Sequence, residues 1–198
     1  MKLSALFMRD AKAFVTARTG VEKSFLLKES LPSQVFQSGF NWFAFEEFDW
    51  ALSNEFWPSI QKLAIASGDS SLLMAVLDPE PEGYFMKEFG YYNWADVPVS
   101  ISQDDYWNLL NVSPEGSPAD SVLVNSEKLI WLPHSAAWAI RGERSSGVCV
   151  LAARERAQID SWHGVDWALK TCLPNNFPDC VVPPEFATSL RLHYETST

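Results

Sequence analysis

Three carboxylates, Glu46, Glu47 and Asp49, alternate with aromatic side chains within residues 45–50. Two acids in an aromatic cleft suit glycoside hydrolysis, because one protonates the leaving oxygen, the other attacks or activates water, and the rings stack on sugar. The same residue types also gather at protein interfaces and at the ends of strands. The segment therefore leaves two hypotheses open: a hydrolase acting on a sugar or similar polar substrate, and a surface that binds another protein.

Nucleophilic catalysis would need a cysteine or serine, a base within hydrogen-bond reach and a third orienting group. The chain offers Cys172 with His163 as one pair of suitable residue types. It offers Ser135 beside His134 as another, but no G-x-S-x-G sequence accompanies them. We therefore expect a buried cysteine and a surface serine, and we assign no catalytic residue.

Metal and nucleotide chemistry have little support in the sequence. Asp160, His163 and Asp166 recur at steps of three and would share one face of a helix, but Gly164 weakens that helix. No Cys-x-x-Cys or His-x-x-x-His pair is present, and both common glycine-rich phosphate-binding loops are absent. We therefore predict no metal site and no cofactor.

The net charge of −10 is distributed unevenly along the chain. Residues 1–40 hold six Lys/Arg and three Asp/Glu, and residues 121–198 hold seven and eight. Residues 41–120 hold only Lys62 and Lys87 against fourteen carboxylates. A nucleic-acid-binding role would need the opposite sign and is disfavoured. The acidity either attracts a basic protein or serves solubility alone.

The acids of the middle segment fall in predicted loops and at the ends of predicted elements, where charge is solvated and can reach a partner. Tryptophans in the same segment are of the kind enriched at interface anchors, although many of the nine tryptophans should simply fill the core. We expect these side chains to converge in one exposed negative region. The predicted partner-binding residues are Glu46, Glu47, Asp49, Asp78, Glu80, Glu82, Asp104, Asp105, Trp50 and Trp107.

Periodicity and turn residues predict the order of the elements. Helices are expected over 3–18 with Gly20 as the stop, from Ser53 or Asn54 to Gly68, from Ser102, over part of 153–173, and from Pro184. Strands are expected within 40–50 and near 71–77, 121–125, 128–132, 137–142 and 147–152. This order favours one α+β domain over residues 1–198, with a largely antiparallel sheet and helices packed on it.

The compartment follows from short apolar runs and from the cysteines. The run from Leu3 to Met8 is too short for an export signal, and no window approaches the roughly 18 apolar residues that cross a bilayer. Three cysteines are an odd number, and Cys149 lies in an apolar run. We expect a soluble cytoplasmic protein without disulfides and without a membrane partner.

Residues 137–152 predict a hairpin that buries its apolar side chains and reverses between Gly142 and Gly147. Arg141, Glu143 and Arg144 would lie at its exposed end. There they would form a local ion pair worth less than about 1 kcal/mol. An alternative is that Arg144 folds back onto the acidic middle segment and orders it.

The sequence KLIWLPHSAAWAIRGERSSGVCVLA, residues 128–152, resembles a hairpin of immunity proteins from bacterial toxin systems, including contact-dependent and type VI secretion systems. The shared pattern is Trp-x-Ile-x-Gly-[Asp/Glu]-Arg followed by an apolar strand. The resemblance implies a stoichiometric inhibitor that binds one cognate toxin, often a nuclease, and blocks its active site. Together with the acidity, it implies a basic toxin domain as the partner.

Overall fold

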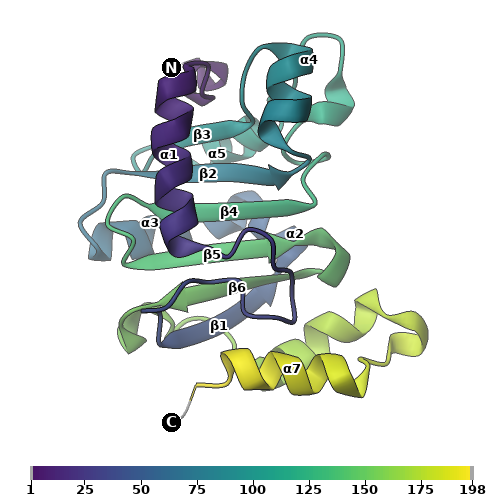
Figure 1. Ribbon diagram of the computed structural model, residues 1–198. Helices are drawn as coiled ribbons and strands as arrows, with labels where there is room; N and C mark the ends of the chain where they lie inside the picture. The colour runs from purple at the N-terminus through teal and green to yellow at the C-terminus, as the bar shows by residue number, and fades with distance from the viewer. Residues whose placement is uncertain (1, 197–198) are drawn as a thin grey trace.

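A computed structural model describes residues 2–196, which form a six-stranded sheet with helices on both faces (Figure 1). Every neighbouring pair of strands is antiparallel, so the predicted α+β architecture is confirmed. Residues 1, 197 and 198 of the predicted domain lie outside the described residues. The strands follow the spatial order β1-β6-β5-β4-β2-β3 and are β1 (Trp42–Glu47), β2 (Ser71–Asp78), β3 (Trp94–Pro98), β4 (Lys128–Pro133), β5 (Trp138–Glu143) and β6 (Val148–Ala153).

Two layers of helices cover the sheet. We call the face that carries α1 and α7 the front, and the face that carries α2, α3 and α5 the back (Figure 1). Each face has its own hydrophobic core. The α-helices are α1 (Ala11–Ser24), α2 (Phe48–Ala51), α3 (Trp57–Ala66), α4 (Lys87–Phe89), α5 (Gln103–Leu110), α6 (Val165–Trp167) and α7 (Pro184–Tyr194).

Strand residues alternate between the two cores because successive side chains of a strand point to opposite faces. In β2, Leu72 and Met74 enter the back core, whereas Leu73 and Ala75 enter the front core. The aromatic strand predicted within 40–50 is likewise covered on both sides. Alternation therefore decides which face of the molecule each functional candidate can reach.

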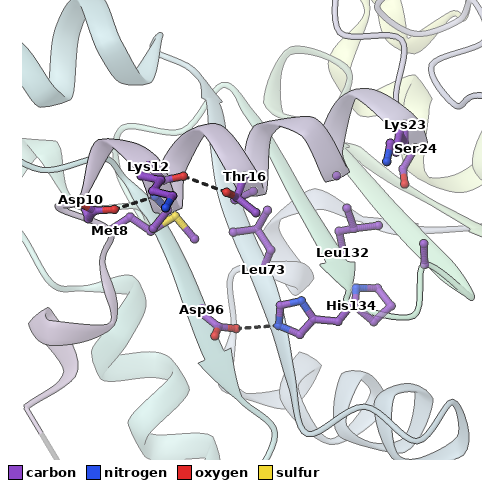
Figure 2. Close-up of a pocket in the computed structure, with 15 residues that line it drawn as sticks. Met8, Asp10, Lys12, Thr16, Lys23, Ser24, Leu73, Asp96, Leu132 and His134 are labelled. Carbon is purple, nitrogen blue, oxygen red and sulfur yellow. Dashed lines mark hydrogen bonds and ion pairs between the residues drawn. The ribbon is translucent and has the colours of Figure 1, made fainter.

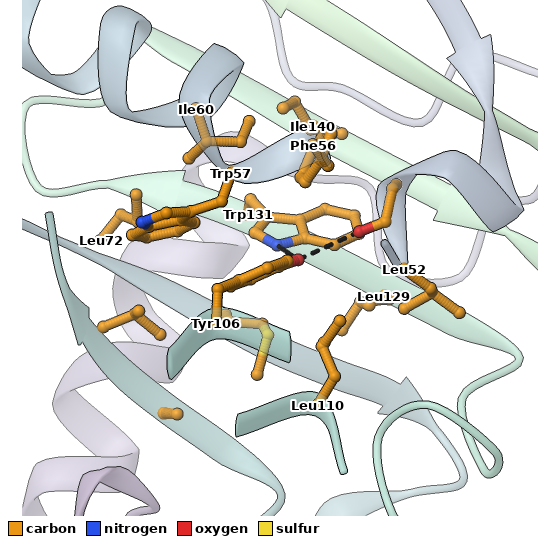
Figure 3. Close-up of a cluster of buried hydrophobic side chains, with 14 of the residues drawn as sticks. Leu52, Phe56, Trp57, Ile60, Leu72, Tyr106, Leu110, Leu129, Trp131 and Ile140 are labelled. Carbon is orange, nitrogen blue, oxygen red and sulfur yellow. Dashed lines mark hydrogen bonds between the residues drawn. The ribbon is translucent and has the colours of Figure 1, made fainter. Parts of the chain in front are cut away.

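Tyr106 joins the helices of the back layer to the sheet. Its ring stacks on Trp57 with centroids 4.7 Å apart, and its hydroxyl donates to the carbonyl of Ala51 at 3.0 Å (Figure 3). The indole N–H of Trp131, from β4, donates to the same hydroxyl at 3.2 Å. These contacts hold α5 beside α2 and α3, because a buried hydroxyl is costly unless its hydrogen bonds are made.

The first helix begins later and ends later than predicted. Residues 3–6 form a 3-10 turn, and Phe7 makes a bridge to Ala95 at the edge of β3. Helix α1 starts after Asp10, whose carboxylate accepts the backbone N–H of Ala13 at 2.7 Å. Gly20 does not end the helix, which continues to Ser24. The carboxylate of Asp10, as the N-cap, therefore determines where α1 begins, whereas periodicity alone placed that start too early.

The predicted hairpin is formed by β5 and β6, but its charges are not exposed. Arg141 is 0% exposed and Glu143 is also buried, because the segment at residues 29–31 crosses over them on the front face. Arg141 Nη2 lies 3.0 Å from Glu143 Oε1 and donates to the carbonyl of Glu29 at 3.3 Å. Glu143 accepts the N–H of Leu31 at 3.2 Å. The expected surface ion pair is therefore a buried anchor for a distant loop.

Arg144 folds back, but not onto a carboxylate. Its guanidinium donates to the carbonyls of Leu123 at 2.9 Å and Ser126 at 3.0 Å. It also lies 4.9 Å from the centre of the Phe48 ring, in the acidic middle segment. Residues 121–125, predicted as a strand, are instead turns, and Arg144 donates to one of their carbonyls, that of Leu123.

Candidate functional site

Glu46 and Glu47 close β1 and point to opposite faces of the sheet. Glu46 is in register with Cys149 of the back core, and Glu47 is in register with Val148 of the front core. The sheet therefore lies between the two carboxylates. They do not supply the paired acids of one cleft, which is the geometry that the hydrolase hypothesis requires.

Glu46 is partly buried at the edge of the sheet, with 15% of its side chain exposed. Its Oε1 lies 3.4 Å from His163 Nε2, and the imidazole stacks on Trp167 with centroids 4.1 Å apart. Burial raises the pKa of Glu46, while the nearby imidazole opposes that rise. Because His163 also pairs its backbone with Phe45, this side-chain contact helps to fasten the segment at residue 163 to β1.

The cysteine that sequence analysis paired with His163 has a different partner. The Cys172 thiol donates to the carbonyl of Gly147 at 3.2 Å, and burial raises its pKa to about 12. A thiol with that pKa stays protonated at neutral pH and is a poor nucleophile. His163 meanwhile contacts Glu46 and Trp167, as described above.

The serine and histidine at 134–135 also have separate roles. Ser135 donates its hydroxyl to Asp69 at 2.7 Å and closes a turn. His134 Nε2 contacts both Ser71 Oγ at 3.1 Å and Asp96 Oδ1 at 3.3 Å. A catalytic triad needs the serine and the acid on different ring nitrogens, so this cluster lacks that arrangement.

The candidate metal ligands at 160–166 do not come together either. Asp166 contacts Arg191 at 2.5 Å and Lys170 at 3.6 Å, and the hydrogen bond from Arg191 lowers the pKa of that carboxyl. Within residues 2–196, no three His, Cys, Asp or Glu side chains gather closely enough to hold a metal ion.

Three predicted acids lie at and just after the end of β2, and two of them have a local partner. Asp78 stands opposite Lys128 in the sheet. Glu80 accepts the backbone N–H of Gly83 and so caps the turn that follows. Glu82 pairs with Arg18 of α1 at 2.5 Å. Glu80 and Glu82 are therefore occupied by contacts within the chain, whereas Asp78 is exposed and makes no ion pair among the described residues.

The two acids at the start of α5 differ from each other. At the helix start predicted at Ser102, Asp105 accepts the backbone N–H of Ser102, and Ser102 Oγ accepts the backbone N–H of Asp105, which together form a capping box. Asp104 is exposed and makes no ion pair among the described residues. Trp107, one turn further along, is 41% exposed.

A smaller set of exposed acids lies on three elements of the back layer that contact one another in sequence: α2, the turn after it, and α5. Gln103 of α5 donates to the carbonyl of Asn54 at 3.5 Å, and Tyr106 contacts α2 as described above. The 3-10 turn Asn54–Phe56 thus lies between α2 and α5 in the back layer. We define the back surface as Asp49, Glu55, Asp104 and Trp107, all exposed.

Trp50, the other predicted interface tryptophan, is half-buried. It packs edge-on against Phe56 and Trp162, with centroids 5.2 and 6.1 Å apart. The Trp50 ring packs mainly against the back core. Only part of the ring is therefore exposed next to Asp49.

The ten predicted residues do not converge in one region. Helix α5 follows Pro98, which stands opposite Ser71, whereas Asp78 lies at the other end of β2, roughly 23 Å away. Glu47 shares a row with Asp78, but three strands lie between β1 and β2, which separates the two by roughly 19 Å. The expected single negative region is therefore wrong, because strand register and sheet order disperse the acids.

Comparison with known proteins adds no relative. Neither a family model, a curated protein nor a solved structure matches this chain. The hairpin resemblance can still be assessed residue by residue. Trp138 and Ile140 fill the back core, and a Cβ on Gly142 would lie within 2.7 Å of Cys149 and 2.8 Å of Phe48. The motif residues thus have structural roles in this chain.

No helix among residues 2–196 combines the length and the apolar character that crossing a bilayer requires.

One site was missed by the sequence analysis. A groove of about 720 Å³ lies between α1 and the front of the sheet (Figure 2). Ala13, Ala17, Gly20 and Ser24 line it from the helix at steps of four, three and four. The sequence feature that could have predicted this groove is the recurrence of small residues at helical spacing, because small side chains leave room between a helix and the sheet beneath it.

Proposed function

We propose that this chain is a non-enzymatic protein that binds a basic partner protein through the back surface. The observation that carries the proposal is Trp107, which stays 41% exposed beside Asp104. Large exposed aromatic side chains are enriched at interface anchors. Asp49 and Glu55, on adjoining elements, add negative charge and make no ion pair among residues 2–196.

The two residue types would act at different stages of binding. Exposed carboxylates attract a basic protein over several ångströms and raise the association rate, which falls as salt screens them. A tryptophan that loses its water in the complex lowers the dissociation rate. Arg18 and Lys128 offset the acids around Asp78, so those acids contribute less.

The hairpin resemblance supports a more specific form of the proposal. In that form the chain is an immunity protein, and its partner is a basic toxin domain that it inhibits in the cytoplasm. Cys149, Cys172 and Cys180 are free thiols, which is compatible with a reducing compartment. Nucleic acid is not part of the proposal, because the back surface carries the wrong sign for it.

Purification of the tagged chain from its own source cell at low salt tests the proposal. We expect a basic protein in equimolar amount. With that partner in hand, D49K/E55K/D104K should slow association by roughly tenfold or more at low salt, and the difference should shrink as salt is added. W107A should instead speed dissociation.

The matched control is E185K, a charge reversal on exposed Glu185 of α7 at the front of the sheet. It should leave both rates unchanged. The proposal is wrong if the triple variant and W107A bind the partner with wild-type rates while remaining folded.

A further inference from the structure

The groove beneath α1 has an apolar floor and a polar rim. Leu73 and Leu132 of the sheet and Met8 contribute apolar surface, and the helix contributes Ala13, Ala17 and Gly20 (Figure 2). Its volume of about 720 Å³ falls within the range of roughly 300 to 1,000 Å³ that is typical of small-molecule sites.

The groove is held open by contacts on an adjoining face of α1. Phe14 stacks on Tyr92 with centroids 3.8 Å apart and packs against Trp94, and Val21 is fully buried. These larger side chains fix the helix against β3. The small residues of the neighbouring face therefore stay apart from Leu73 and Leu132 instead of collapsing onto them.

Ser24 is a polar group at the end of this groove without a partner in the protein. The residue is 4% exposed and lines the groove, and its hydroxyl makes no hydrogen bond within residues 2–196. The oxygen is not enclosed by protein, so the hydroxyl can donate a hydrogen bond into the groove. A ligand with a polar end would satisfy it.

Two lysines give the groove its charge preference. Lys12 and Lys23 line it, and neither forms an ion pair among the described residues. The acids on the rim are already engaged, because Asp10 caps α1 and Asp96 contacts His134 at 3.3 Å. Asp10 and Asp96 balance the two lysines in formal charge, but only the ammonium groups of the lysines are left free to pair with an anionic group.

We propose that this groove binds a small elongated molecule with an apolar chain and a carboxylate at one end. The chain lies along the floor between α1 and the sheet. Lys12 and Lys23 lie eleven residues apart on α1, a rise of roughly 16 Å, so a linear chain can lie under the helix while its carboxylate meets one lysine. The carboxylate end also accepts the hydroxyl of Ser24 where it meets Lys23.

Isothermal titration calorimetry with dodecanoate, below its micelle-forming concentration, tests this site. We expect saturable binding, at least about tenfold tighter than that of 1-dodecanol, because a charge-assisted hydrogen bond is lost with the alcohol. K12Q/K23Q should remove that preference for the acid. K28Q, which changes an exposed lysine outside the groove, should keep it.

A second variant tests the place of binding. A Cβ added at Gly20 meets no atom within 4 Å, so G20L fits the helix while its side chain occupies the groove. It should abolish dodecanoate binding and, because leucine favours helix over glycine, raise the melting temperature. G20A should retain binding.

Three results would overturn the proposal: no binding of dodecanoate to the folded wild-type chain, equal affinity for the acid and the alcohol, or wild-type affinity in G20L. The melting temperatures of all variants separate loss of the site from loss of the fold.

Discussion

Arg141 and Glu143 show that a charged residue in a turn sequence can belong to the core. Both lie on the front face of β5, and the segment at residues 29–31 covers them. One nitrogen of the pair, Arg141 Nη1, is buried without a hydrogen-bond partner. The arginine therefore depends on Glu143 to offset its burial, because an unpaired buried charge is strongly destabilising.

We predict that E143L lowers the free energy of unfolding by about 3 to 5 kcal/mol, since it leaves Arg141 charged and unpaired. The double variant R141L/E143L should recover much of that loss, because it removes both charges from the core. Urea unfolding measures both values. A double variant that is no more stable than E143L would contradict the coupling.

Single elements of this fold depend on partners far from them in sequence. The 121–127 segment forms no strand, and Arg144 supplies hydrogen bonds to its carbonyls at Leu123 and Ser126. Arg144 is the arginine of the Trp-x-Ile-x-Gly-[Asp/Glu]-Arg pattern, and its role here is to hold the loop that precedes β4 against β5 and β6.

R144M should cost about 2 kcal/mol of unfolding free energy, because it removes charge-assisted hydrogen bonds to the carbonyls of Leu123 and Ser126. Amide hydrogen exchange should rise in residues 121–127 before it rises in the sheet. The control is R156M, on an exposed arginine that lies over Trp42, which should change stability by under about 0.5 kcal/mol. Equal effects of the two variants would remove Arg144 from this role.

At the scale of the whole molecule, the sheet separates two kinds of surface. Helix α1, from the basic stretch of the chain, covers the front with Lys12 and Lys23 unpaired among the described residues. The back layer comes from the acidic middle segment and presents the back surface. The two proposals therefore concern opposite faces, and a result for one does not decide the other.

Like charges on adjoining elements of the back layer should repel each other when no partner is bound. We predict that E55Q raises the free energy of unfolding by a few tenths of a kcal/mol at low salt, and that the gain fades near 1 M salt, where the screening length is about 3 Å. Thermal unfolding across a salt series measures this. E82Q should act in the opposite direction, because Glu82 pairs with Arg18. A loss of stability in E55Q at low salt would show that these acids do not repel each other.

The sequence by itself determined the parts of this protein that depend on local interactions. The strand at 71–78, the capping box at Ser102 and the β5–β6 hairpin were predictable, because alternation, caps and turn residues act over a few positions. Only the tertiary structure decided which charges are buried and which acids share a surface. Glu143 meets the backbone of Leu31, 112 positions away, and the order of the strands set β6, β5 and β4 between Glu47 and Asp78. Such pairings depend on how elements pack against one another, and no short stretch of residues contains that information.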